Sequence, residues 1–399
     1  MKNIEKTQNP YLDEKVVDAC SIFGMMDTTG KRHSGKTISR AIANMHVRGN
    51  GLGGGFAVYG LYPDYADLYA FHIIYLSQEG KDETEYFIKQ KFRVIYEEEI
   101  PTKPIPVIVN PPLAWRYFVE VSSRESKCQA EDDYIVDCVM KVNTLIKDAF
   151  VFSSGKNMGV FKGVGYPEEI AEYFELENYD GYLWIAHGRF PTNTPGWWGG
   201  AHPFNILDWT VVHNGEISSY GINRRYLEQF GYCCTMQTDT EVVAYAVDLL
   251  IRKHRLPVEV VAKIFAPPFW NQIGRFPEDE KGFFQALRQV YGSLLLNGPF
   301  TIIVAHQGEM IGITDRIRLR PLIAGIKDQM LYLSSEESAI RLICPDLDKS
   351  WTPMGGEPVI GSLNKTLQYS SDKAVGEIVS AAKYEEVLNN AYEANYTLP

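Results

Sequence analysis

The chain has 399 residues, of which 45% are hydrophobic and 13% aromatic, and its 39 basic and 50 acidic side chains give a formal charge of −11. This length predicts one large domain with a sizeable insert, and the apolar and aromatic content excludes a disordered protein. The acidic balance excludes a broad binding surface for nucleic acid or anionic membranes, so we expect protein or small-molecule partners.

The chain opens with a charged leader, residues 1–19, which lacks the apolar run of a secretion signal. The elements predicted next are a buried strand at 20–27, a helix at 36–48 and a strand at 56–62. Gly49, Gly51 and Gly54 have the spacing of a dinucleotide-binding loop, but such a loop follows a strand and opens a helix. Here that order is reversed, so we interpret the segment as a turn.

Residues 67–153 show strands and helices in the order β-α-β-β-α-β. The predicted strands are 67–76, 93–100, 114–121 and 149–154, and the predicted helices are 83–92 and 132–146. This is the order of a ferredoxin-like unit, so we expect an inserted α+β subdomain at 67–153. The proline-rich segment 102–113 fits a linker or a sheet edge.

The remaining elements favour stacked antiparallel sheets covered by helices over a doubly wound parallel sheet, which makes the fold class α+β. In chain order they are a helix at 159–174, strands at 182–190 and 209–217, helices at 238–254 and 278–291, and strands within 300–334 closed by a helix. The tail, residues 366–399, has the pattern of an amphipathic helix.

Six cysteines stand at positions 20, 128, 138, 233, 234 and 344, and their spacing matches no zinc site, so we expect no metal in this chain. No stretch of the sequence approaches the ~20 apolar residues that cross a bilayer. These features predict a cytoplasmic protein with reduced thiols and no membrane contact.

Four segments concentrate residues suited to chemistry: Cys20, HGRFPTNT at 187–194, HNGEI at 213–217 and TDTEV at 238–242. Each alone also fits a structural role, because cysteines fill cores, Asn-Gly forms turns and TDTE caps helices. In this order, however, they resemble the class II glutamine amidotransferases, whose glutaminase domain belongs to the N-terminal-nucleophile hydrolases. The stretch 187–221 is most similar to the glutaminase part of glutamate synthases.

This resemblance implies a four-layer αββα N-terminal-nucleophile hydrolase fold over residues 20–365, with the ferredoxin-like insert outside it. If the chain begins at Cys20, the α-amino group, with a reference pKa of about 8, lies within a few bonds of the thiol and can act as its base. The scheme requires cleavage between Ala19 and Cys20. It therefore predicts that residues 1–19 are a propeptide.

The other site residues follow from what glutamine hydrolysis needs. The Asn214 side chain and the Gly215 backbone N–H supply two donors for the oxyanion of the tetrahedral intermediate. Arg189 offers a planar fork to the carboxylate of glutamine, and Asp239 offers a counter-charge to its ammonium group. The resemblance assigns the same roles and also places Thr192 on the glutamine.

The loop from Phe190 to Gly200 is similar to the family's segment that closes over bound glutamine, and its aromatic residues would exclude water. Docking of a partner by an exposed apolar loop is the alternative for this segment. His187, His202 and His213 are expected to orient loops rather than to bind metal.

No phosphoribosyl-transfer loop and no second large domain is recognisable after residue 250. We therefore expect a glutaminase subunit that hydrolyses L-glutamine to L-glutamate and ammonia through a Cys20 thioester and holds no cofactor itself. The resemblance implies that ammonia passes to a separate glutamate synthase subunit with FMN and an iron–sulfur cluster. Two alternatives stay open: a glutaminase for another acceptor, such as an N-methylglutamate-type synthase, and a non-catalytic module that binds glutamine.

Overall fold

The computed structural model describes residues 19–122, 129–190 and 196–367. The predicted propeptide, except for Ala19, lies outside these residues, as do Thr192 and the tail beyond residue 367. None of the helices in these residues combines the length and the hydropathy that a membrane span needs.

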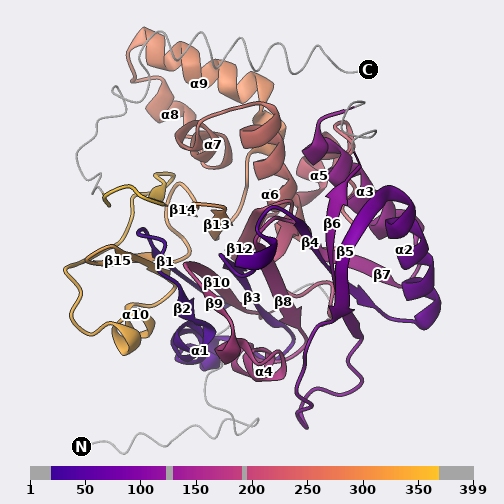
Figure 1. The fold of residues 1–399 in the computed structure, drawn as a ribbon. Helices are drawn as coiled ribbons and strands as arrows, with labels where there is room; N and C mark the ends of the chain where they lie inside the picture. Colours follow the sequence, from indigo (N-terminus) through magenta and orange to yellow (C-terminus); the bar gives the residue numbers. More distant parts are fainter. Residues whose placement is uncertain (1–18, 123–128, 191–195, 368–399) are drawn as a thin grey trace, which may run out of the picture.

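Two antiparallel sheets stack face to face at the centre of the molecule (Figure 1). The larger sheet contains, in spatial order, β17 (Lys349–Trp351), β15 (Ile323–Lys327), β16 (Met330–Ser334), β1 (Ser21–Asp27), β10 (Leu183–Gly188), β3 (Gly54–Tyr59) and β8 (Met158–Gly163). The smaller sheet contains β11 (Phe204–Ile206), β12 (Trp209–Gly215), β13 (Phe300–His306), β14 (Glu309–Thr314) and β18 (Val359–Ser362). A short pair, β2 (His33–Ser34) with β9 (Asp180–Gly181), lies apart from both sheets.

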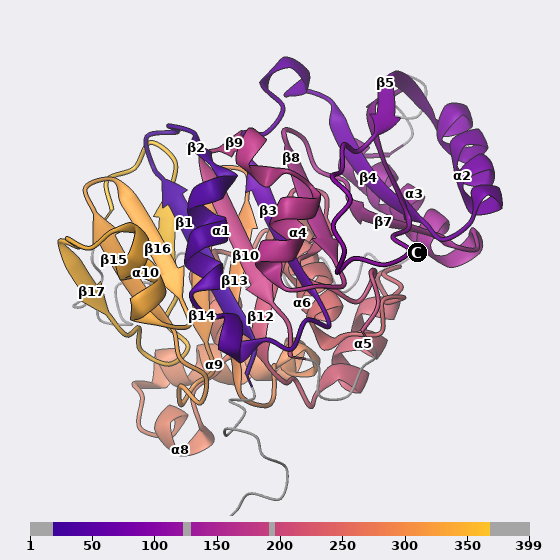
Figure 2. The same cartoon turned by 90° about the horizontal axis from the view of Figure 1, so that it is seen from below.

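Helices cover the outer face of each sheet, as Figure 2 shows. The larger sheet is covered by α1 (Gly35–Ala43), α4 (Pro167–Tyr173) and α10 (Glu337–Ile343). The side of the smaller sheet carries α5 (Tyr220–Glu228), α6 (Asp239–Val247), α7 (Val258–Phe265), α8 (Trp270–Ile273) and α9 (Glu278–Val290). The predicted four-layer αββα arrangement is therefore confirmed.

The insert forms a separate four-stranded sheet at one side of the sandwich, next to β8 and β11 (Figure 1). Its elements are β4 (Tyr69–Tyr75), α2 (Gln78–Lys91), β5 (Phe92–Glu99), β6 (Leu113–Val121), α3 (Glu131–Leu145) and β7 (Ala149–Ser153). The spatial order β5-β6-β4-β7 places the first and third strands of the unit at its centre. The element order is that of a ferredoxin-like unit; the domain boundaries at 67–153 and 20–365 stay a prediction.

The central strands are buried on both faces, which explains why they appear in the sequence as continuous apolar runs. Every residue of β1, β10 and β3 is buried. Uniform burial also explains one wrong prediction, that of a single helix at 159–174. In the structure these residues form most of β8, whose residues are all buried, and then α4, which begins with Pro167 in its first turn.

Candidate active site

Cys20 directly precedes β1, and its thiol lies against the segment that follows the neighbouring strand β10. Ser21 pairs with Gly188 in the β1–β10 ladder, so the residues just beyond each strand end come together. The Phe190 N–H donates to Cys20 Sγ at 3.3 Å, and Sγ lies 3.8 Å from the Phe190 carbonyl oxygen. Within the described residues the thiol thus bonds to backbone, and no histidine side chain bonds to it.

The surroundings of Cys20 favour a protonated thiol. Burial raises the pKa of Cys20, while the Phe190 N–H and the positive charge of Arg189 act in the opposite direction. A thiol in this state needs a base before it can attack an amide. A free α-amino group on the same residue would supply that base.

Asn214 and Gly215 end β12 in the smaller sheet. Asn214 is fully buried, and its Nδ2 donates to Ser335 Oγ at 3.2 Å. Its Oδ1 has no hydrogen-bond partner among the described residues. The backbone N–H of Ile22 donates to the same Ser335 hydroxyl at 3.1 Å. Ser335 therefore joins Asn214 to β1, immediately beyond Cys20.

The backbone at Gly215 requires glycine. Its φ of +136° lies in the region that L residues rarely adopt, and a Cβ there would lie 1.9 Å from the Pro299 carbonyl oxygen. The missing side chain lets the Pro299 carbonyl oxygen approach the Gly215 backbone closely. The role of the Gly215 N–H as an oxyanion donor stays a prediction.

Arg189 and Asp239 provide one positive and one negative charge at the same end of the sheets. Arg189 is 3% exposed and directly follows β10. Asp239 opens α6, and its Oδ2 accepts from the Ile217 N–H at 2.8 Å, while Oδ1 lies 3.6 Å from His213 Nδ1. Burial acts to raise the pKa of Asp239, but His213 and the Ile217 N–H outweigh it and hold that pKa below its usual value. The two charges suit the carboxylate and the ammonium of an amino acid.

Three buried histidines connect the strands around the site. The rings of His187 and His202 stack with centroids 4.0 Å apart. His187 Nε2 lies 2.9 Å from the His213 carbonyl oxygen, and His202 Nε2 lies 2.7 Å from Thr240 Oγ1. Burial lowers the pKa of His187 to about 3, so this ring is neutral at physiological pH. These contacts tie β10, β12, α6 and the segment before β11 together, and the loop-orienting role stays a prediction.

The described part of the predicted closing loop consists of Phe190 and residues 196–200. The Trp197 ring lies 5.1 Å from that of Phe150 in the insert, and the Trp198 ring lies 5.9 Å from that of Tyr173 in α4. Both tryptophans are half-buried, so this end of the loop is anchored by aromatic contacts. Thr192 lies outside the described residues, and its contact with glutamine stays a prediction.

Two residues near the nucleophile were not among the predicted site residues. Arg48 donates from Nε to the Cys20 carbonyl oxygen at 3.2 Å and from Nη1 to Glu336 Oε1 at 2.8 Å. Ser335 bridges β1 and Asn214, as described above. A sequence signal exists for Ser335, because it directly follows an apolar strand, just as Arg189 does.

Replacing Ser335 by alanine is expected to lower kcat about tenfold, because Asn214 then loses the hydrogen bond that orients its amide. The KM for glutamine is expected to change little, since Ser335 follows β16, which β1 separates from β10 and Arg189 in the strand order. Steady-state glutamate release measures both constants. Threonine at 335, which keeps the hydroxyl, is expected to restore most of kcat, and a full loss with threonine would contradict the role of the hydroxyl.

Comparisons with known proteins bear on this site. A sequence model of the family described as Glutamine amidotransferases class-II matches residues 84–386. An uncharacterized protein of Archaeoglobus fulgidus is 59% identical over 371 residues, which cover 92% of this chain and 98% of that protein. A putative glutamine amidotransferase of Methanothermobacter thermautotrophicus is 27% identical over 329 residues, which cover 81% of this chain and 93% of that protein.

Among solved structures, the glutamine phosphoribosylpyrophosphate amidotransferase from B. subtilis aligns with a TM-score of 0.43 and 14% identity, covering 86% of this chain and 47% of that one. The family match begins after Cys20, so the role of Cys20 depends on the geometry described above. The match spans well over half of the 399 residues. This chain belongs to the class II glutamine amidotransferases.

Proposed function

We propose that this chain hydrolyses L-glutamine to L-glutamate and ammonia, with Cys20 as the nucleophile once residues 1–19 are removed. The observation that carries the proposal is the position of the Cys20 sulfur, 3.3 Å from the Phe190 backbone nitrogen. At the same end of the stacked sheets lie the opposite charges of Arg189 and Asp239, whose fields both act on the thiol. Family membership supports the reaction type.

In the proposed mechanism the α-amino group of Cys20 takes the thiol proton, and the sulfur attacks the amide carbon of glutamine. Asn214 Nδ2 and the Gly215 N–H donate to the oxyanion that forms. The proton then passes to the leaving nitrogen, the C–N bond breaks, and ammonia leaves a thioester on Cys20. Water hydrolyses this thioester, which releases glutamate and regenerates the thiol.

We further propose that the ammonia goes to a separate glutamate synthase-type subunit that carries FMN and an iron–sulfur cluster. Support for this finer assignment comes from the similarity of residues 187–221 to the glutaminase part of glutamate synthases. The test is to count products after mixing the purified chain with its copurifying partner. Supplied with 2-oxoglutarate and a two-electron donor, a glutamate synthase pair yields two glutamates per glutamine, while a glutaminase that feeds another acceptor yields one glutamate and one different aminated product.

The mature protein is expected to begin at Cys20, because the proposed base exists only when the Ala19–Cys20 peptide bond has been cleaved. Ala19, on the other side of that bond, is only 7% exposed. Intact mass and N-terminal sequencing of the active protein measure the outcome. An active enzyme that still begins at Met1 would contradict the scheme, whatever its rate.

A further inference from the structure

Lys162 is a buried lysine in β8, an edge strand of the larger sheet. Its side chain is enclosed, with 2% of the residue exposed. The Lys162 Nζ donates to the Gly199 carbonyl oxygen at 3.0 Å and lies 4.4 Å from the centroid of the Phe204 ring. Because lysine is almost never fully buried without a partner, its ammonium group needs an opposite charge nearby.

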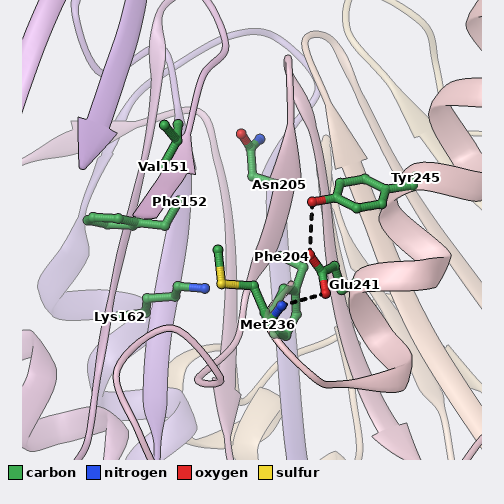
Figure 3. A pocket seen from close by; sticks show the side chains of 8 residues that line it. All are labelled: Val151, Phe152, Lys162, Phe204, Asn205, Met236, Glu241 and Tyr245. Atoms are coloured by element: carbon green, nitrogen blue, oxygen red, sulfur yellow. Dashed lines mark hydrogen bonds between the residues drawn. The ribbon is translucent and has the colours of Figure 1, made fainter. Parts of the chain in front are cut away.

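Glu241 supplies that opposite charge. It is 1% exposed, and its carboxylate accepts from the backbone N–H groups of Thr235 at 2.9 Å and Met236 at 2.8 Å, and from the Tyr245 hydroxyl at 3.0 Å. Figure 3 shows Lys162 and Glu241 on opposite sides of a small cavity of about 10 Å³. A cavity of this size is at the lower limit of what one water molecule needs.

The two groups act on each other electrostatically. Burial lowers the pKa of Lys162 to about 7, an effect that Glu241 opposes and Arg189 strengthens. Burial likewise raises the pKa of Glu241 to about 7, and the hydrogen bonds from Thr235 and Met236 act against it, as does the charge of Lys162. Each of the two groups therefore stabilises the charged form of the other.

Lys162 holds the backbone beside Arg189. The carbonyl group that accepts its hydrogen bond belongs to Gly199. The next residue, Gly200, lies so close to Arg189 that a Cβ on it would be 3.4 Å from Arg189 Nη1. Lys162 thus fixes the segment that packs against the guanidinium group proposed to bind the carboxylate of glutamine.

Glu241 holds the start of α6 in a corresponding way. Its carboxylate binds the backbone of Thr235 and Met236, just before the cap residue Thr238 of α6. Asp239, proposed to bind the ammonium of glutamine, stands two positions before Glu241 in the same first turn. Lys162 therefore supports the segment that contacts Arg189. Glu241 supports the start of the helix that carries Asp239.

On the basis of the proposed glutaminase function, we propose that Lys162 and Glu241 are positioning residues for glutamine binding. The pair holds the segment beside Arg189 and the start of α6 at the separation that one amino acid requires. Such a role affects ground state and transition state alike, so its loss raises KM and leaves kcat nearly unchanged. A merely structural role of Lys162 would lower the stability of the protein but would not raise KM at an unchanged kcat.

The test is the Lys162→Met variant, which keeps the aliphatic stem and removes the ammonium group. We expect the KM for glutamine to rise about tenfold or more, with kcat within about threefold of the wild type. Labelling of Cys20 by the diazoketone analogue of L-glutamine is expected to slow by a similar factor. Labelling by iodoacetamide, which needs neither Arg189 nor Asp239, is expected to keep its rate.

Lys263→Met is the control, because Lys263 is a half-buried lysine that also donates to a backbone carbonyl, that of Gly356 at 3.1 Å. It is expected to keep the wild-type KM. The double variant Lys162→Met/Glu241→Gln leaves no unpaired buried charge, which keeps the test usable if the single variant unfolds. Its KM is expected to be no higher than that of Lys162→Met alone.

Three results would overturn the proposal that Lys162 and Glu241 act as a pair. The first is an unchanged KM in folded Lys162→Met, and the second is a slowing of iodoacetamide labelling equal to that of the diazoketone. The third is a double variant in which the effects of the two substitutions on KM multiply. A wild-type protein that begins at Cys20 and does not hydrolyse glutamine would instead refute the proposed function. The two failures are thus distinguishable.

Discussion

Replacing Cys20 by alanine is expected to abolish glutamine hydrolysis, with turnover falling on the order of 10⁴-fold or more, because no thioester can form without the sulfur. In the structure the sulfur accepts a hydrogen bond from the Phe190 N–H at 3.3 Å, and it lies in the field of both Arg189 and Asp239. Glutamate release by the mature variant, measured beside the wild type, gives the result.

Cys344→Ala is the matched control for this variant, since Cys344 is also a half-buried free cysteine, at the end of α10. It is expected to keep full activity. The diazoketone analogue of L-glutamine should label Cys20 and spare Cys344. Equal labelling of the two thiols, or turnover in Cys20→Ala within about tenfold of the wild type, would favour a glutamine-binding module whose thiol has no role in catalysis.

Most parts of the site that the sequence could predict lie at the ends of buried strands. Arg189 follows the buried apolar strand β10, and Asn214 stands near the end of the buried strand β12. In both places the change to polar residues marks the edge of the sheet. Asp239 stands in the first turn of a helix with a threonine cap, which is a local signal as well. The order of strands and helices in the insert was predictable for a similar reason, because a local sequence pattern marks each of these elements.

The parts that could not be predicted depend on contacts between residues far apart in the chain. Ser335 binds Ile22 and Asn214, which precede it by 313 and 121 residues. Lys162 lies in β8, whose uniform burial gave no alternation of polar and apolar residues, and its partner Glu241 is in a different layer. No local pattern indicates such pairs, because only the stacking of the two sheets and the helices brings them together.

Replacing Asn214 by alanine is expected to lower kcat by about 10²- to 10³-fold while the KM for glutamine stays within a few fold of the wild type. The amide is fully buried, and Ser335 holds it through Nδ2, so its position is set before glutamine binds. A donor fixed in this way acts on the oxyanion, which exists in the transition state and not in bound glutamine. The expected loss therefore falls on kcat.

The control for Asn214→Ala is Asn143→Ala, which removes a buried asparagine of α3 whose Oδ1 accepts from the Val151 N–H at 2.8 Å, within the insert. Both variants lose a buried amide, so both are expected to show a lower midpoint of thermal unfolding. Only Asn214→Ala is expected to lose kcat. A rise in KM at unchanged kcat would instead make Asn214 a contact of bound glutamine, and the oxyanion role would then fall to Gly215 alone, where φ of +136° and the close Pro299 carbonyl exclude any other residue.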